Sequence, residues 1–164
     1  NSKYYSSLKS LREYGWVDRI CKNVKGVNSR LDELQAYILL YKLELFNKNF
    51  IKRQLIAKKY LDEISNQRIK LPYIRANTVH AFHLFVIQVK ERNKFIKFLK
   101  NKKIETAIHY SKPLHKHEGF AKITKFDKLV NTEKLSNKIV SLPMNENLTN
   151  KAIKKIINTI NEFK

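Results

Sequence analysis

The stretch that decides the fold of this chain is Gly26-Val27-Asn28-Ser29-Arg30-Leu31-Asp32-Glu33-Leu34-Gln35-Ala36. Ser29 and Asp32 have the spacing of a capping box, which predicts a helix that begins near Ser29. The first N–H groups of a helix have no internal partner, and the helix dipole adds partial positive charge there. Asn28 and Arg30 can add side-chain donors. The stretch therefore has the geometry of an anion site, although the spacing alone favours the other interpretation, in which Ser29 caps the helix and Arg30 lies in solvent.

The helix expected after Ser29 is apolar around most of its circumference. Its apolar residues follow a heptad spacing that further leucines widen: Leu31, Leu34, Ile38, Tyr41 and Leu45, with Leu39, Leu40 and Leu43. A face this broad indicates burial on more than one side. The helix should be central to its domain or packed against another subunit.

The rest of the chain reads as alternating helices and strands. Helices are predicted over residues 3–14, 51–64, 92–102, 135–140 and 148–163, with Thr149 as the N-cap of the last. Strands are predicted over residues 79–89, which should be central in a small sheet, and 104–110, with a short extended piece at 69–71. The sequence leaves open whether the two main strands are parallel or antiparallel.

Length and composition limit the class of protein. A chain of 164 residues with 43% hydrophobic content can bury one core or two small ones. No apolar run reaches membrane-spanning length and the first residues lack a signal-peptide core, so a cytoplasmic location and no membrane partner are expected. The single cysteine, Cys21, excludes an intrachain disulfide and a cysteine cluster for zinc.

The formal charge of +20 raises the question of nucleic acid. Lysines outnumber arginines and are spread through every segment, whereas nucleic-acid binders more often concentrate arginines and aromatic residues in one stripe. This pattern disfavours a nucleic-acid partner, although a non-catalytic basic nucleic-acid-binding module stays open as the alternative. The histidine pairs at 80 and 83 and at 115 and 117 have no accompanying cysteine, so no metal site is predicted.

Several motifs occur in the order seen in one enzyme family. The stretch from Gly26 to Ala36 resembles the signature of the DegT/StrS-type nucleotide-sugar aminotransferases, which use pyridoxal phosphate (PLP). Leu11-Arg12-Glu13-Tyr14-Gly15-Trp16 precedes it, and Ile108-His109-Tyr110, Pro113-Leu114-His115 and Ser141-Leu142-Pro143 follow. The resemblance implies an α/β fold: the C-terminal small domain of a fold-type I aminotransferase, with long N-terminal helices followed by a small sheet packed with helices.

The same resemblance implies roles for five residues. In that family the long helix belongs to a homodimer interface, and the preceding Asn and Arg reach the phosphate of the partner subunit's PLP, so Asn28 and Arg30 are expected to bind the cofactor. Tyr14, His109 and Tyr110 are expected to bind the substrate at the active-site mouth. Positive potential would also suit the pyrophosphate of a nucleotide sugar.

The resemblance covers only the C-terminal part of the enzyme. The Schiff-base lysine belongs to a larger N-terminal domain, so residues 1–28 are expected to link from that domain and residues 29–164 to form the small domain. The implied activity moves an amino group, with glutamate as the expected donor, to a keto-sugar of a nucleoside-diphosphate sugar for deoxyamino-sugar and surface polysaccharide biosynthesis. This chain alone is expected to be inactive. Residues 116–120 depart from the family pattern, which affects substrate preference.

Overall fold

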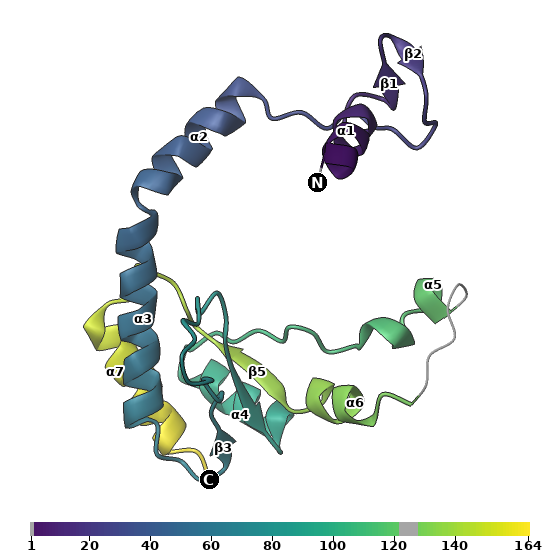
Figure 1. Cartoon of the computed structure of the whole chain (residues 1–164). Helices are drawn as coiled ribbons and strands as arrows, with labels where there is room; N and C mark the ends of the chain where they lie inside the picture. The colour runs from purple at the N-terminus through teal and green to yellow at the C-terminus, as the bar shows by residue number, and fades with distance from the viewer. Residues whose placement is uncertain (1, 122–127) are drawn as a thin grey trace. The chain divides into compact units, whose positions relative to one another are not determined.

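In the computed structural model, which describes residues 2–121 and 128–164, the chain divides into the units Asn1–Phe46 and Asn47–Lys164. The first unit contains α1 (Ser2–Leu11), the hairpin of β1 (Trp16–Val17) and β2 (Ile20–Cys21), and α2 (Glu33–Glu44), as Figure 1 shows. The predicted helix over 3–14 ends early, at Leu11. Tyr14 and Gly15 have φ of 60° and 73°, a left-handed backbone that stops a helix.

The segment after α1 is held by close backbone packing between two glycines. A Cβ atom on Gly26 would lie 1.8 Å from the backbone nitrogen of Gly15, and one on Gly15 would lie 1.8 Å from the backbone oxygen of Asn23. The hairpin between them turns at Asp18 and Arg19, whose positive φ values of 50° and 63° are typical of a tight two-residue turn. Gly26 is therefore required for close approach.

The long apolar helix starts later than predicted. α2 begins at Glu33, with Asp32 at its N-cap in extended conformation and no side-chain cap hydrogen bond, so the prediction of a capping box at Ser29 is wrong. The reason is non-local. The N–H of Ser29 donates to the carbonyl of Arg12 at 2.9 Å, and Asn28 forms an antiparallel bridge with Glu13, which keeps residues 28 and 29 extended.

The second unit is built on a small antiparallel sheet. Its strands are β3 (Ile69–Lys70), β4 (Phe85–Val89) and β5 (Ile139–Leu142), in the order β3-β4-β5. The prediction that β4 is central is confirmed. The helices of this unit are α3 (Phe46–Glu63), which starts at the boundary, α4 (Arg92–Asn101), α5 (Glu118–Ala121), α6 (Val130–Ser136) and α7 (Asn150–Asn161), with the 3-10 helix η1 (Leu114–Lys116).

Three strand and helix predictions in the second unit are wrong in part. Residues 79–84 do not join β4, because Phe82 is buried with φ of 46°. Residues 104–110 make only a single antiparallel bridge, from Ala107 to Ser141. The predicted helix over 135–140 is divided, since α6 ends at Ser136 and β5 starts at Ile139. The helices predicted over residues 92–102 and 148–163 are confirmed as α4 and α7.

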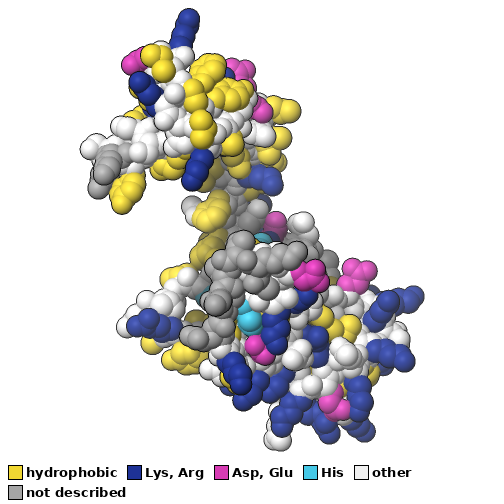
Figure 2. All heavy atoms as spheres, turned by 90° about the vertical axis from the view of Figure 1, so that its right-hand side faces the viewer, with side chains coloured by type: hydrophobic (Ala, Val, Ile, Leu, Met, Phe, Trp, Pro, Cys, Tyr) yellow, Lys and Arg dark blue, Asp and Glu magenta, His cyan; other side chains and the backbone are white. Residues whose placement is uncertain are grey.

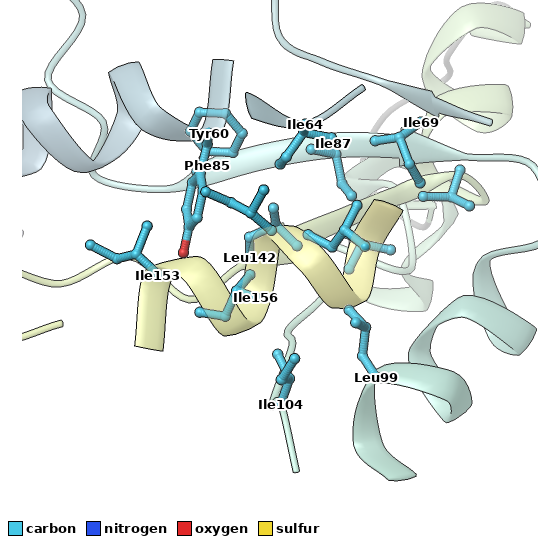
Figure 3. Close-up of a cluster of buried hydrophobic side chains, with 14 of the residues drawn as sticks. Tyr60, Ile64, Ile69, Phe85, Ile87, Leu99, Ile104, Leu142, Ile153 and Ile156 are labelled. Carbon is cyan, nitrogen blue, oxygen red and sulfur yellow. The ribbon is translucent and has the colours of Figure 1, made fainter. Parts of the chain in front are cut away.

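The core of the second unit lies between α3, the sheet, α4 and α7 (Figure 3). Alternate residues of β4 point into it, because side chains of a strand alternate between faces. The Tyr60 ring on α3 packs edge-on against Phe85 with ring centroids 5.0 Å apart, and its hydroxyl donates to the carbonyl of Pro143 at 2.9 Å. The largest fully buried side chains belong to Tyr60, Phe85, Phe95, Ile87, Leu99, Ile160, Val89 and Val140.

Arg53 on α3 ties two loops to this core. Its guanidinium donates to the carbonyl oxygens of Phe82 and Met144 at 3.3 and 3.2 Å, and it pairs with the Glu146 carboxylate at 2.9 Å. The irregular segment before β4 and the loop after β5 are thus fixed by one side chain. Within the described residues, none of the helices is both long and apolar enough to cross a membrane.

Candidate functional site

Two of the predicted site segments lie side by side in the first unit. The N–H of Tyr14 donates to the carbonyl of Val27 at 3.2 Å, and the Glu13–Asn28 bridge continues the pairing. The Tyr14 side chain is 42% exposed, and its ring contacts that of Trp16 with centroids 5.4 Å apart. The ring therefore has an aromatic neighbour and an open side that a ligand could contact.

Asn28 and Arg30 lie on the extended segment before α2. Both are exposed, and in the part of the chain that the structure describes their side chains make no hydrogen bond or ion pair. The unpaired N–H groups of α2 come after Asp32, so the helix N-terminus does not coincide with Asn28. Any anion held by Asn28 and Arg30 is held by an amide and a guanidinium from an extended strand-like segment.

α2 exposes its apolar side chains along its whole length. None of its residues is buried in the described chain, and exposed fractions reach 72% for Leu34 and 73% for Tyr37. The expectation that this helix is central to its own domain is therefore not met. The other expectation, packing against a second subunit, remains a prediction.

In the second unit, β5 positions His109. Ser141 is 4% exposed, and its backbone pairs in both directions with Ala107, with N–O distances of 2.8 and 3.2 Å. Its hydroxyl lies 2.9 Å from Nδ1 of His109. This contact fixes the imidazole ring, while the next side chain, Tyr110, is 75% exposed.

A cavity of about 360 Å³ adjoins Tyr110. It is lined by Ile108, Tyr110, Ser111, Lys112, Leu114 and His117. Nε2 of His117 lies 3.2 Å from the carbonyl of Lys112, which closes the loop around the cavity. The lysine ammonium and the tyrosine hydroxyl can bind a phosphate or a sugar hydroxyl. Sequence reasoning did not assign Lys112 or His117 to this site, although their place just after a strand end was a usable signal.

The segment that departs from the family pattern is anchored to α6. Glu133 accepts from Lys116 Nζ at 2.7 Å and lies 3.1 Å from Nε2 of His115. The hydrogen bond from Lys116, followed by that from His115, holds the pKa of Glu133 below its usual value. Residues 115 and 116 are therefore fixed beside the cavity rather than extended into solvent.

The histidines do not assemble a metal centre among the described residues, where no group of three His, Cys, Asp or Glu side chains could hold an ion. Nδ1 of His80 accepts from the N–H of Phe82 at 3.0 Å. His83 lies at a bend before β4, not on the strand where it was expected. These two side chains belong to an irregular loop.

Comparison with known proteins identifies the family. Residues 1–161 match the model of the DegT/DnrJ/EryC1/StrS aminotransferase family. The chain belongs to this family. Its DegT-type sequence is 36% identical over 156 residues to a dTDP-3-amino-3,6-dideoxy-alpha-D-galactopyranose transaminase of Aneurinibacillus thermoaerophilus, covering 95% of this chain and 43% of the relative. It is also 36% identical over 152 residues to a UDP-2-acetamido-2-deoxy-3-oxo-D-glucuronate aminotransferase of Pseudomonas aeruginosa, covering 92% and 42%.

The fold agrees with solved members of the DegT family. The structure of DesV from S. venezuelae in complex with a ketimine intermediate superposes with a TM-score of 0.89 at 26% identity, covering 99% of this chain and 44% of DesV. The chain thus spans less than half the length of the relatives it matches. The expected fold, the C-terminal part of a fold-type I sugar aminotransferase, is confirmed.

Proposed function

We propose that this chain is the C-terminal part of a PLP-dependent aminotransferase that moves an amino group, with glutamate as donor, to a keto-sugar of a nucleoside-diphosphate sugar. The match over residues 1–161, with relatives named as transaminases of dTDP- and UDP-linked sugars, carries the proposal. We further propose deoxyamino-sugar and polysaccharide biosynthesis in the cytoplasm as its setting. The chain alone is expected to be inactive.

Asn28 and Arg30 are proposed to bind the phosphate of PLP in the partner subunit of a homodimer. Their side chains fit this role because both carry N–H donors, are exposed and make no hydrogen bond within the described chain. Bound PLP would supply the electron sink that amino-group transfer needs. The role of these two residues is to fix the phosphate, since the Schiff-base lysine is proposed to lie in the larger domain that precedes residues 1–28.

The substrate is proposed to contact Tyr14, His109 and Tyr110. The His109 ring is oriented by Ser141, and Tyr110 adjoins a cavity that also presents Lys112. Lys112 can neutralise part of the pyrophosphate charge, while Tyr110 and His109 donate to or accept from sugar hydroxyls. The exposed apolar residues of α2 supply the proposed dimer contact, because exposed apolar surface of this extent is normally covered by a partner.

A chimera tests this function. The chain replaces the corresponding C-terminal residues of the Aneurinibacillus transaminase, and the product is assayed with PLP, glutamate and a dTDP-linked 3-keto sugar. Activity and visible absorbance of bound PLP are expected. Asn28→Ala should weaken PLP binding about tenfold, as expected for one hydrogen bond to a charged group, whereas Asn23→Ala should leave it unchanged.

Two results contradict the proposal. One is a folded chimera that binds PLP but shows no transfer to any nucleotide-linked keto-sugar. The other is equal PLP affinity in the Asn28→Ala and Asn23→Ala variants. Far-ultraviolet circular dichroism of each variant separates loss of folding from loss of function.

A further inference from the structure

The second unit carries most of the positive charge. Twenty-six of the 34 lysines and arginines, but only nine of the 14 aspartates and glutamates, lie in residues 47–164, a formal charge of +17. Figure 2 shows many Lys and Arg side chains over this unit. Like charges repel each other, so positive side chains that are gathered around a cavity favour binding of an anion there. Positive side chains spread evenly over a surface do not indicate such a site.

One cavity brings several of these charges together. It has a volume of about 510 Å³ and lies between the start of β3, the end of β4 and the residue before β5. This volume is within the roughly 300–1,000 Å³ usual for small-molecule sites. Its lining residues are Gln67, Arg68, Lys70, Gln88, Val89, Lys90, Glu91, Lys138 and Phe163. Four cations therefore face one carboxylate.

The single carboxylate does not neutralise the cavity. Glu91 accepts from Lys94 at 2.5 Å and lies 3.3 Å from Nη1 of Arg68. The hydrogen bond from Lys94 is the main cause that lowers the pKa of Glu91, with Arg68 contributing less, so the carboxylate stays ionised at neutral pH. Lys94 does not line the cavity, but it forms an ion pair with Glu91. Lys70, Lys90 and Lys138 take part in no ion pair within the described chain.

The backbone around the cavity is held in place by the core. The N–H of Val89 donates to the carbonyl of Lys138 at 2.8 Å, and the Phe163 ring packs against Phe95 and Phe98, with ring centroids 5.1 and 5.5 Å away. Val89 and Phe163 are only 2% and 7% exposed and belong to the core, so the polar and charged side chains supply the accessible lining.

We propose that this cavity binds a soluble diphosphate-bearing ligand, whose phosphate oxygens are held by Arg68, Lys70 and Lys138. Arginine presents a fork of donors that matches phosphate oxygens, and lysine adds point charge. The site is separate from the cavity at Tyr110, since the two cavities share no lining residue. It depends on no part of the proposed transferase activity.

Binding of uridine diphosphate and of pyrophosphate to the full 164-residue chain tests the proposal by calorimetry and by amide NMR shifts. Arg68→Gln with Lys138→Gln removes two charges from the cavity and leaves a polar amide at each position. Lys154→Gln with Lys155→Gln removes two charges from the exposed face of α7 and is the matched control. The cavity variant should weaken uridine diphosphate at least tenfold and the control less than twofold.

Uridine diphosphate and pyrophosphate should both bind and should both be weakened by the cavity variant, because the diphosphate is the group that the cations hold. Amide shifts should centre on residues 67–70, 88–91 and 138, and they should persist in Tyr110→Ala, which separates this cavity from the one at Tyr110. Absence of binding, or equal loss in both charge variants, overturns the proposal. The proposal is also overturned if a single-stranded oligonucleotide binds more tightly than uridine diphosphate and both charge variants weaken it equally. That result would indicate a diffuse surface for polyanions.

Discussion

Arg53 offers the sharpest test of how the second unit is held together. Its side chain is 24% exposed, and Nη1 donates to carbonyl oxygens of Phe82, His83 and Met144 at 3.3, 3.4 and 3.2 Å. Nη2 pairs with Glu146 at 2.9 Å. Replacing this arginine by methionine keeps an unbranched side chain against α3 but removes every one of these donors.

The expected loss can be worked out from these contacts. Hydrogen bonds to charged groups contribute about 1.5–3 kcal/mol each when buried, and they do not add fully when they share one side chain. The carbonyl of His83 is exposed and can bind water instead, and a partly exposed ion pair such as that with Glu146 contributes at most about 1 kcal/mol. Arg53→Met should therefore lower the free energy of unfolding by about 2–3 kcal/mol.

Urea unfolding followed by far-ultraviolet circular dichroism measures this loss. Tryptophan fluorescence would not, because the only tryptophan, Trp16, lies in the first unit. Arg75→Met is the matched control: Arg75 is exposed and its side chain makes no hydrogen bond or ion pair in the described chain, so its loss should stay within about 0.5 kcal/mol. Glu146→Gln should cost less than half the Arg53→Met value. Equal stabilities of Arg53→Met and Arg75→Met would refute the idea that one guanidinium anchors both loops.

Further perturbations probe individual contacts. Tyr60→Phe removes one buried hydrogen bond and should cost about 1 kcal/mol in urea unfolding. Thr149→Ala removes the side-chain acceptor for the N–H of Ala152 and should cost about 1 kcal/mol, with Thr132→Ala as an exposed control. Gly26→Ala places a methyl group 1.8 Å from a backbone nitrogen, so near-ultraviolet dichroism of the tryptophan should be lost while most helical signal remains. The pKa of Glu146 is lowered by its own backbone N–H and, less strongly, by Arg53. The ionised Glu146 carboxylate should therefore add to the free energy of unfolding above pH 4.5, and this contribution should decline as the pH falls below 4.5. Glu146→Gln should remove that part of the pH dependence.

The elements that sequence predicts correctly are those set by local pattern. α7 carries an apolar stripe that ends up buried at Ile153, Ile156, Ile157 and Ile160, and Thr149 caps it as expected. The central position of β4, paired with β3 and β5, follows from its β-branched and aromatic residues, which suit a strand with one buried and one half-buried face. In each case the residues that determine the element lie within it, so the local sequence is enough to predict the element.

The errors occur where a distant segment competes for backbone groups. The residues around Ser29 favour a helix start there. In the structure, however, the N–H of Ser29 donates to the carbonyl of Arg12, and Asn28 forms a bridge with Glu13. Residues 79–84, just before β4, have the composition of a strand. In the structure, Arg53 on α3 donates hydrogen bonds to carbonyl groups of this segment. Local propensity amounts to a few tenths of a kcal/mol per residue, which a single well-placed hydrogen bond can exceed.

The candidate site shows the same division between local and distant causes. The His109-Tyr110 pair is visible in the sequence, but what orients it is Ser141, thirty-two residues away. Through its backbone Ser141 fixes Ala107, and through its hydroxyl it fixes the ring of His109. Because one buried residue makes both contacts, Ser141→Ala should release the imidazole while leaving the strand pairing intact. Changed side-chain NMR signals of the His109 ring in Ser141→Ala, with a loss of unfolding free energy of no more than about 1 kcal/mol, would therefore separate positioning of the site from stability of the fold.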